Sequence, residues 1–219
     1  MASDFESDRH AALALFPLPP EIVRRLDIYA DLLRKWQKTI NLVANSTLPQ
    51  LWTRHIADSL QVSAAVPEAR IWADLGSGGG FPGLVTAIRL AETPGARVHL
   101  IESDQRKCAF LRDVSRETSA PSIIHNARIE TIIDNLGDPI DAVSARALAP
   151  LPVLVDYAKN LLAEGAVGVF LKGQDYEAEV KALSAAGQYR IMSASSVTAP
   201  VSRLLLVFDK EAETQARSG

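Results

Sequence analysis

The segment RIWADLGSGGGFPG, from Arg70 to Gly83, decides the fold of this chain. Its apolar beginning predicts a buried strand at 70–74, and a helix is predicted directly after the glycines, at 82–91. Glycine is required where a backbone turns tightly or lies against a ligand with no Cβ between them. Such a loop lies at the carboxyl edge of a doubly wound sheet, where these folds bind ligands. The segment therefore predicts an α/β fold with a ligand at the loop, and this many glycines argue against a bare turn.

Short apolar strands alternate with helices along the rest of the chain. That alternation predicts right-handed crossovers and a mostly parallel sheet. The last two strands follow each other closely, so we expect that pair to be antiparallel. The result is an α/β fold, a Rossmann-like doubly wound sheet of seven strands. The predicted strands are 70–74, 97–102, 122–126, 140–145, 166–171, 189–195 and 203–208, and the helices after the first strand are 82–91, 104–118, 128–135, 150–162 and 175–186.

Two further helices are predicted before the first strand, at 20–38 and 47–65, from apolar residues spaced by three or four. In the second helix, Thr47 and Gln50 have the spacing of a capping box. His55 and Asp58 lie one turn apart, which favours a packed, hydrogen-bonded pair over a substrate contact. We therefore divide the chain into an N-terminal helical extension (1–66), a ligand-binding domain (67–210) and a polar C-terminal tail (211–219).

The charges around the glycine loop distinguish between two nucleoside cofactors. Gly78, Gly80 and Gly83 satisfy the G-x-G-x-x-G pattern of dinucleotide folds, which is a weak signal alone. Asp74, at the mouth of the loop, would repel a pyrophosphate but attract the ammonium and sulfonium groups of S-adenosyl-L-methionine. Glu102, at the end of the second strand, is placed to accept hydrogen bonds from a ribose. The residues therefore favour S-adenosylmethionine over a nicotinamide dinucleotide.

With those residues in view, the chain resembles the 16S ribosomal RNA guanine-N7 methyltransferases, also called glucose-inhibited division protein B or RsmG. The resemblance covers about 26–210, and the RHIADSL block (54–60) ahead of GSGGGFPG (76–83) is specific in combination. It implies a class I methyltransferase fold and cofactor contacts by Gly76, Phe81, Ile129, Glu130 and Arg146. Other matching pieces are Trp36, Ile40-Asn41-Leu42, Leu100-Ile101-Glu102-Ser103, Arg106-Lys107, Phe110-Leu111, Arg128-Ile129-Glu130, Ser144-Ala145-Arg146-Ala147 and Lys172-Gly173.

The activity that the resemblance implies is methylation of N7 of one guanine in 16S ribosomal RNA, in the 530 loop of the small subunit. N7 has an in-plane lone pair and no proton, so no general base is expected. Catalysis then depends on positioning, for which Arg146 and Lys172 are the candidates. The chain has Val43 and Ser46 where the family often has threonine and arginine, which puts an RNA contact by that loop in doubt.

The distribution of charge allows an RNA partner although the net charge is −3. Between Glu21 and His55 there are six basic side chains and three acidic ones, and phosphate contacts need only a local patch. A solvated helix face is the alternative. The candidate RNA-binding residues are Arg34, Lys35, Lys38, Arg54 and Arg128.

Composition also narrows the class of protein. The chain has no apolar run of the ~20 residues that a membrane span needs. The acidic first residues are unlike a secretory signal, and Cys108 is the single cysteine, so we expect a cytoplasmic protein. The four histidines have no metal-ligand spacing, so no metal is expected. Open alternatives are a small-molecule methyltransferase, a non-catalytic cofactor-binding regulatory module and a nicotinamide-dependent enzyme.

Overall fold

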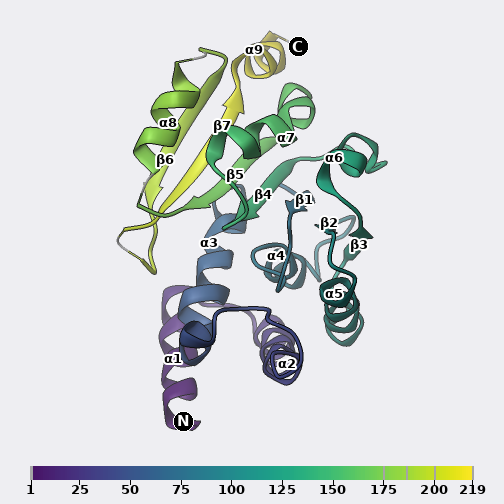
Figure 1. The fold of residues 1–219 in the computed structure, drawn as a ribbon, viewed down its shortest axis with the longest axis vertical. Coiled ribbons are helices and arrows are strands. Elements are labelled where there is room, and N and C mark those ends of the chain that lie inside the picture. The colour runs from purple at the N-terminus through teal and green to yellow at the C-terminus, as the bar shows by residue number, and fades with distance from the viewer. Residues whose placement is uncertain (1, 175, 186, 200, 219) are drawn as a thin grey trace.

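The computed structural model describes residues 2–174, 176–185, 187–199 and 201–218, and it contains one mixed sheet of seven strands (Figure 1). The strand order is β3-β2-β1-β4-β5-β7-β6; only β7 runs antiparallel to its neighbours. This confirms the predicted sheet, with each strand within two residues of its expected bounds. The strands are β1 (Ile71–Leu75), β2 (Arg97–Glu102), β3 (Ser122–Asn126), β4 (Ala142–Arg146), β5 (Val167–Lys172), β6 (Tyr189–Ser195) and β7 (Arg203–Asp209).

Helices cover both faces of this sheet (Figure 1). The predicted helix at 175–186 is α8, and residues 175 and 186 lie outside the described part of the chain. The predicted helix at 47–65 consists of three consecutive pieces, η1, η2 and α3. The helical elements are α1 (Ala2–Leu15), α2 (Pro20–Trp36), η1 (Asn45–Gln50), η2 (Trp52–Ala57), α3 (Asp58–Ala64), α4 (Gly83–Arg89), α5 (Gln105–Thr118), α6 (Ile129–Ile132), η3 (Ile133–Asn135), α7 (Leu151–Ala163), α8 (Tyr176–Ser184) and α9 (Lys210–Ser218).

Two hydrophobic clusters hold these layers together, one on each face of the sheet. The first joins α1–α5 to the sheet and includes Leu26 from α2, Trp72 from β1 and Phe110 from α5. The second packs α7 against β4, β5 and β7 and includes Leu154 and Phe170. Residues on both sides of position 66 therefore belong to one core. No described helix is long and apolar enough to cross a membrane.

Three local features differ from the sequence prediction. The helices α1 and α9 were not predicted. Few described apolar side chains of α1 reach the core, namely Ala12 with the partly buried Phe5 and Leu13, and Asp8 adds a polar contact by accepting from the Trp52 amide at 2.7 Å. Glu213 of α9 pairs with Arg190 of β6. The predicted capping box is wrong. Thr47 lies inside the 3-10 helix η1, and its hydroxyl donates to the Ala44 carbonyl instead of capping a helix.

Candidate cofactor and substrate site

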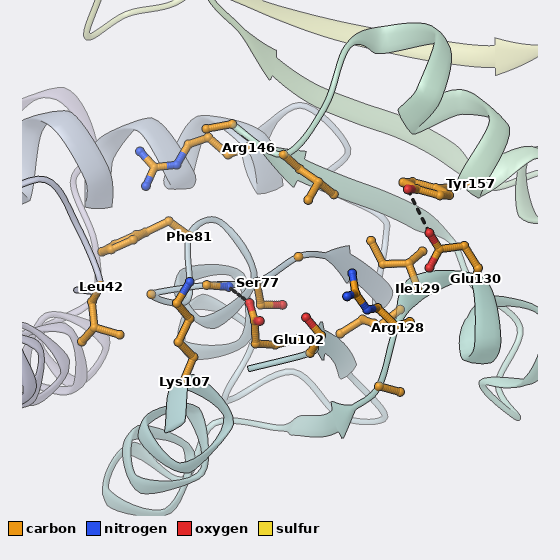
Figure 2. Close-up of a pocket in the computed structure, with 18 residues that line it drawn as sticks. Leu42, Ser77, Phe81, Glu102, Lys107, Arg128, Ile129, Glu130, Arg146 and Tyr157 are labelled. Carbon is orange, nitrogen blue, oxygen red and sulfur yellow. Dashed lines mark hydrogen bonds between the residues drawn. The ribbon is translucent and has the colours of Figure 1, made fainter. Parts of the chain in front are cut away.

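A cavity of about 430 Å³ opens at the carboxyl edge of β1, β2 and β4, where the sequence predicted it (Figure 2). In Figure 2, Phe81 and Leu42 lie at one end, Glu102 at the middle, and Glu130 with Tyr157 at the other end. The cavity is lined by Leu42, Gly76, Ser77, Gly78, Gly79, Phe81, Ile101, Glu102, Ser103, Lys107, Ala127, Arg128, Ile129, Glu130, Arg146, Ala147, Leu148 and Tyr157.

The glycine loop forms the floor of this cavity, and Glu102 holds it in place. Gly78 has a φ of +54°, a left-handed conformation that favours glycine. Its amide donates to Glu102 Oε2 at 2.9 Å, and Glu102 Oε1 accepts from the Asp104 amide at 2.8 Å. Each carboxylate oxygen keeps a lone pair for another donor. Glu102 thus fixes the loop and still presents acceptors to the cavity.

The N-terminal helices hold the same loop from its other side. Tyr29 of α2 is fully buried, and its hydroxyl donates to the Gly79 carbonyl at 2.5 Å. A Cβ at Gly79 would lie 2.9 Å from the Leu42 carbonyl, so a side chain there has no room. The extension is therefore part of the wall of the site.

Phe81 and Arg146 stack at one end of the cavity. The Arg146 guanidinium lies 5.0 Å from the centre of the Phe81 ring, and its Nη1 donates to the Arg54 carbonyl at 3.3 Å. Arg146 makes no ion pair with any described carboxylate, and burial lowers the pKa of its guanidinium from the ordinary value. It remains a cation, because arginine does not lose its charge in proteins. A cation held in this way is suited to an anionic group of a ligand.

The opposite end of the cavity is formed by the start of α6 and by α7. The Tyr157 hydroxyl donates to Glu130 Oε1 at 3.0 Å, and Ile129 lies between this pair and Glu102 (Figure 2). Hydrogen bonding lowers the pKa of Glu130, its own backbone amide first and Tyr157 second. Ile129 presents an apolar surface and Glu130 an acceptor, a combination that fits a heterocyclic base.

Asp74 lies behind the glycine loop rather than at its mouth. The side chain is fully buried and is absent from the cavity lining. Its Oδ1 accepts from the Ser144 hydroxyl at 2.7 Å. Burial raises the pKa of this carboxyl to about 6, and the Ser144 hydrogen bond opposes that shift. The predicted effect of Asp74 on a cationic ligand can therefore act only through space.

Lys172 also lies away from the cavity. Its Nζ pairs with Glu179 Oε2 at 2.8 Å and donates to the Ala149 carbonyl at 2.9 Å. Glu179 accepts in turn from the Leu151 amide. These contacts fix the segment 147–151, in which Leu148 lies directly over Gly76. Lys172 therefore positions a loop of the site and does not line the cavity.

The predicted pair of His55 and Asp58 is wrong. His55 Nε2 lies 2.8 Å from the Thr47 hydroxyl, while Asp58 accepts from Gln61, Ser196 and Thr198. Burial, and then the nearby cation of Arg146, lowers the pKa of His55 to about 3. The His55 ring packs 5.0 Å from the Phe81 ring and is neutral at any physiological pH.

The remaining predicted residues fall into two groups. Gly76, Gly78, Phe81, Glu102, Ile129, Glu130, Arg128 and Arg146 all line the cavity. Arg34, Lys35 and Lys38 line a separate hollow at the end of α2, and Arg54 is exposed on η2. The sequence reasoning did not assign Tyr29, Lys107 or Tyr157 to the site. Tyr29 occupies the apolar stripe of a helix, so nothing in its spacing distinguishes it from an ordinary core residue.

Comparison with known proteins places the chain in a family. The family model described as rRNA small subunit methyltransferase G matches residues 22–204. Proteins named ribosomal RNA small subunit methyltransferase G from Nitrobacter winogradskyi and Bradyrhizobium diazoefficiens are each 56% identical over 174 residues. Each match covers 80% of this chain; it spans 63% of the Nitrobacter protein, less than two thirds of its length, and 67% of the Bradyrhizobium protein.

Solved structures share the fold at low sequence identity. A putative O-methyltransferase from Klebsiella pneumoniae superposes with a TM-score of 0.63 at 14% identity, covering 93% of this chain and 96% of that one. An O-methyltransferase from Bacillus cereus in complex with SAH gives 0.61 at 13% identity, covering 93% and 97%. The fold is thus that of the class I methyltransferases. Together with the family match over residues 22–204, these findings show that the chain belongs to the rRNA small subunit methyltransferase G family.

Proposed function

We propose that this protein transfers a methyl group from S-adenosylmethionine to N7 of a specific guanine in 16S ribosomal RNA. One observation carries the proposal: the glycine-loop cavity has an unpaired arginine at one end and an apolar and acceptor pair at the other. The family match supports the reaction and the substrate class. The substrate is naked 16S RNA or the assembled small subunit, and the protein acts in the cytoplasm, where ribosomes are found.

The residues of the cavity fit S-adenosylmethionine. Gly78 has no side chain, and a Cβ built there meets nothing closer than the Gly76 carbonyl at 3.7 Å, so the space above it is open. Arg146 would hold the cofactor's carboxylate, Glu102 its ribose hydroxyls, and Ile129 with Glu130 its adenine. A pyrophosphate at the glycine loop would lie beside the Glu102 carboxylate, which already accepts from the Gly78 amide, and this argues against a dinucleotide.

The chemistry requires little of the protein beyond positioning. When bound, the cofactor supplies an electrophilic methyl group on a sulfonium. Guanine N7 needs no deprotonation, so the chain has to orient the base and accommodate the shift of charge. Phe81 and Arg146 lie together at the end of the cavity beside Leu42, and we infer that the target base is placed against this pair. Because an A-form major groove is too narrow for side chains, the target guanine must be unpaired or splayed out.

The methyl-transfer rate is expected to show no dependence on a group that titrates near pH 7. The pKa of His55 is about 3, and burial also lowers the pKa values of His99 and His125. The measurement is a single-turnover pH–rate profile with 16S RNA or small subunits, with the methylated base identified by mass spectrometry. A limb near pH 7 that disappears in a histidine variant would demonstrate a general base. The acceptor would then be a protonated atom, and the N7 assignment would be wrong.

Replacing Asp74 by asparagine is expected to change both stability and cofactor affinity. The folded-state pKa of about 6 lies above the ordinary 3.8, so the folded protein binds the extra proton. The contribution of the Asp74 carboxyl to the free energy of unfolding is fully present below pH 3.8. It falls by roughly 3 kcal/mol as the pH rises to and through 6. In Asp74→Asn this loss should be absent from denaturant unfolding curves.

Calorimetry on Asp74→Asn should also show weaker binding of S-adenosylmethionine, because the charge behind the loop is gone. The control is Asp156→Asn, an exposed carboxylate on α7. Equal cofactor affinity in wild type and Asp74→Asn would remove the electrostatic reason for preferring a sulfonium cofactor.

A further inference from the structure

Two basic hollows lie near the cofactor cavity, at the end of α2 and at the start of α5. The first, of about 540 Å³, lies at the end of α2, and the second, of about 380 Å³, lies between the segment 37–41 and the start of α5. Lys38 lines both hollows, and Lys107 lines both the second hollow and the cavity. The three depressions are therefore neighbours on the surface, with Lys38 between the first and the second and Lys107 between the second and the cavity. We call the five cations along this path the basic track: Arg34, Lys35, Lys38, Arg106 and Lys107.

The charge along the basic track is strongly unbalanced. Only two carboxylates, Asp31 and Asp104, line the two hollows. Asp104 is engaged at the start of α5, where it accepts from the amides of Arg106 at 2.8 Å and Lys107 at 3.2 Å. In the described part of the chain, Lys35, Lys38 and Lys107 make no ion pair. The protein has a net charge of −3, so this concentration of free cations is a local exception.

The second hollow has a preformed shape. Arg106 Nη2 donates to the Thr39 carbonyl at 2.6 Å and ties the segment 37–41 to α5. Gln37 Oε1 accepts from the amides of Leu42 at 2.9 Å and Val43 at 3.1 Å, which fixes the chain that follows. A ligand bound there would order few groups, so less entropy is lost on binding.

A phosphate backbone is the ligand that matches this arrangement. Cations in a groove follow the backbone of single-stranded nucleic acid, and a target guanine at the cavity has to be single-stranded for N7 to be reached. Figure 2 shows the Lys107 side chain extending from α5 toward the glycine loop, between Phe81 and Glu102, where it lines the cavity. We propose that the basic track binds the backbone of single-stranded RNA, with the phosphate next to the target nucleotide held by Lys38, Arg106 and Lys107. This inference rests on the proposed function.

The test compares two double variants with the same loss of charge. Lys38→Gln with Arg106→Gln removes two cations from the track, and Lys159→Gln with Lys181→Gln removes two exposed cations from α7 and α8. RNA affinity is measured against salt with a single-stranded fragment of 16S RNA. The track variant should lower the slope of log K against log salt by about 1.4, which is two contacts at about 0.7 each. The control variant should keep the wild-type slope.

A second variant removes charge without breaking the Arg106 hydrogen bond that fixes the segment 37–41. The side chains of Lys35 and Lys38 make no hydrogen bond with any described residue, so Lys35→Gln with Lys38→Gln should lower the slope while calorimetry shows unchanged cofactor affinity. Wild-type methylation of 16S RNA together with unchanged slopes in both track variants overturns the track and leaves the proposed function intact. Cofactor binding by the wild type with no methylation of 16S RNA or small subunits overturns the proposed function and the track with it.

Discussion

Arg146→Ala is expected to lower the single-turnover rate of methyl transfer by about 10²-fold. The guanidinium both stacks on Phe81 and faces the cavity, so its loss displaces the ring and removes the cation that would hold the ligand's anionic group. An ångström-scale misplacement of reacting groups costs about that factor. Rates at saturating cofactor and cofactor affinity by calorimetry should be measured separately, because they report positioning and binding respectively.

Two further variants separate the charge of Arg146 from its stacking on Phe81 and control for the loss of an arginine. Arg146→Lys keeps the charge but loses the planar stack, so it should recover cofactor affinity more than rate. Arg116→Ala removes an exposed arginine of α5 and should behave as wild type. A fully active Arg146→Ala would show that the Phe81 ring is positioned without it, and the role given to this stack would be abandoned.

Gly78→Val is expected to abolish measurable binding of S-adenosylmethionine. A branched side chain at this position points into the open space of the cavity, and the φ of +54° is strained for a β-branched residue such as valine. Gly95→Val is the matched control: Gly95 has a φ of +76° and no neighbour within 4 Å, but it lies in the loop before β2, at the other end of the sheet. Both variants carry backbone strain, of order 1–3 kcal/mol.

The comparison isolates the effect of filling the cavity. Thermal unfolding should show similar destabilisation in the two glycine variants, whereas calorimetry should show lost cofactor binding in Gly78→Val alone. If Gly78→Val is folded and binds the cofactor as tightly as Gly95→Val does, the glycine loop is not the cofactor's cradle.

The sheet could be predicted because its strands are short, apolar and separated by clear helical segments. The loop at 76–83 follows from local chemistry, and so does Glu102 at the end of β2. The spacing of apolar residues does not predict elements in which such residues are few. In α1 the apolar contacts are few, with Ala12 its one fully buried described residue and Phe5 and Leu13 partly buried, and they are supplemented by Asp8 and by the pair of Arg9 with Asp27.

Residue spacing in the sequence could not predict which side chains at the strand ends reach the cavity. Asp74 and Lys172 end strands at the correct edge of the sheet, as predicted, yet Asp74 lies under the loop and Lys172 points to Glu179. Strand position fixes the edge on which a residue lies, but the side chain's partners decide whether it reaches the cavity. Tyr29 shows the reverse case, since its contact with Gly79 joins residues 50 positions apart.

Because the core is shared across position 66, we expect that residues 67–210 do not fold as a stable unit on their own. A fragment beginning at residue 67 would lose the packing of α2 and α3 against α4 and α5, and Phe110 would lose its contacts with the rings of Tyr29 and Trp36. Apolar surface exposed in this way promotes aggregation. The fragment would also lack the Tyr29 hydroxyl that holds the Gly79 carbonyl. Changing or replacing the first 66 residues would thus alter the core and the glycine loop. The extension therefore differs from a binding module that is joined to its partner domain only by a linker.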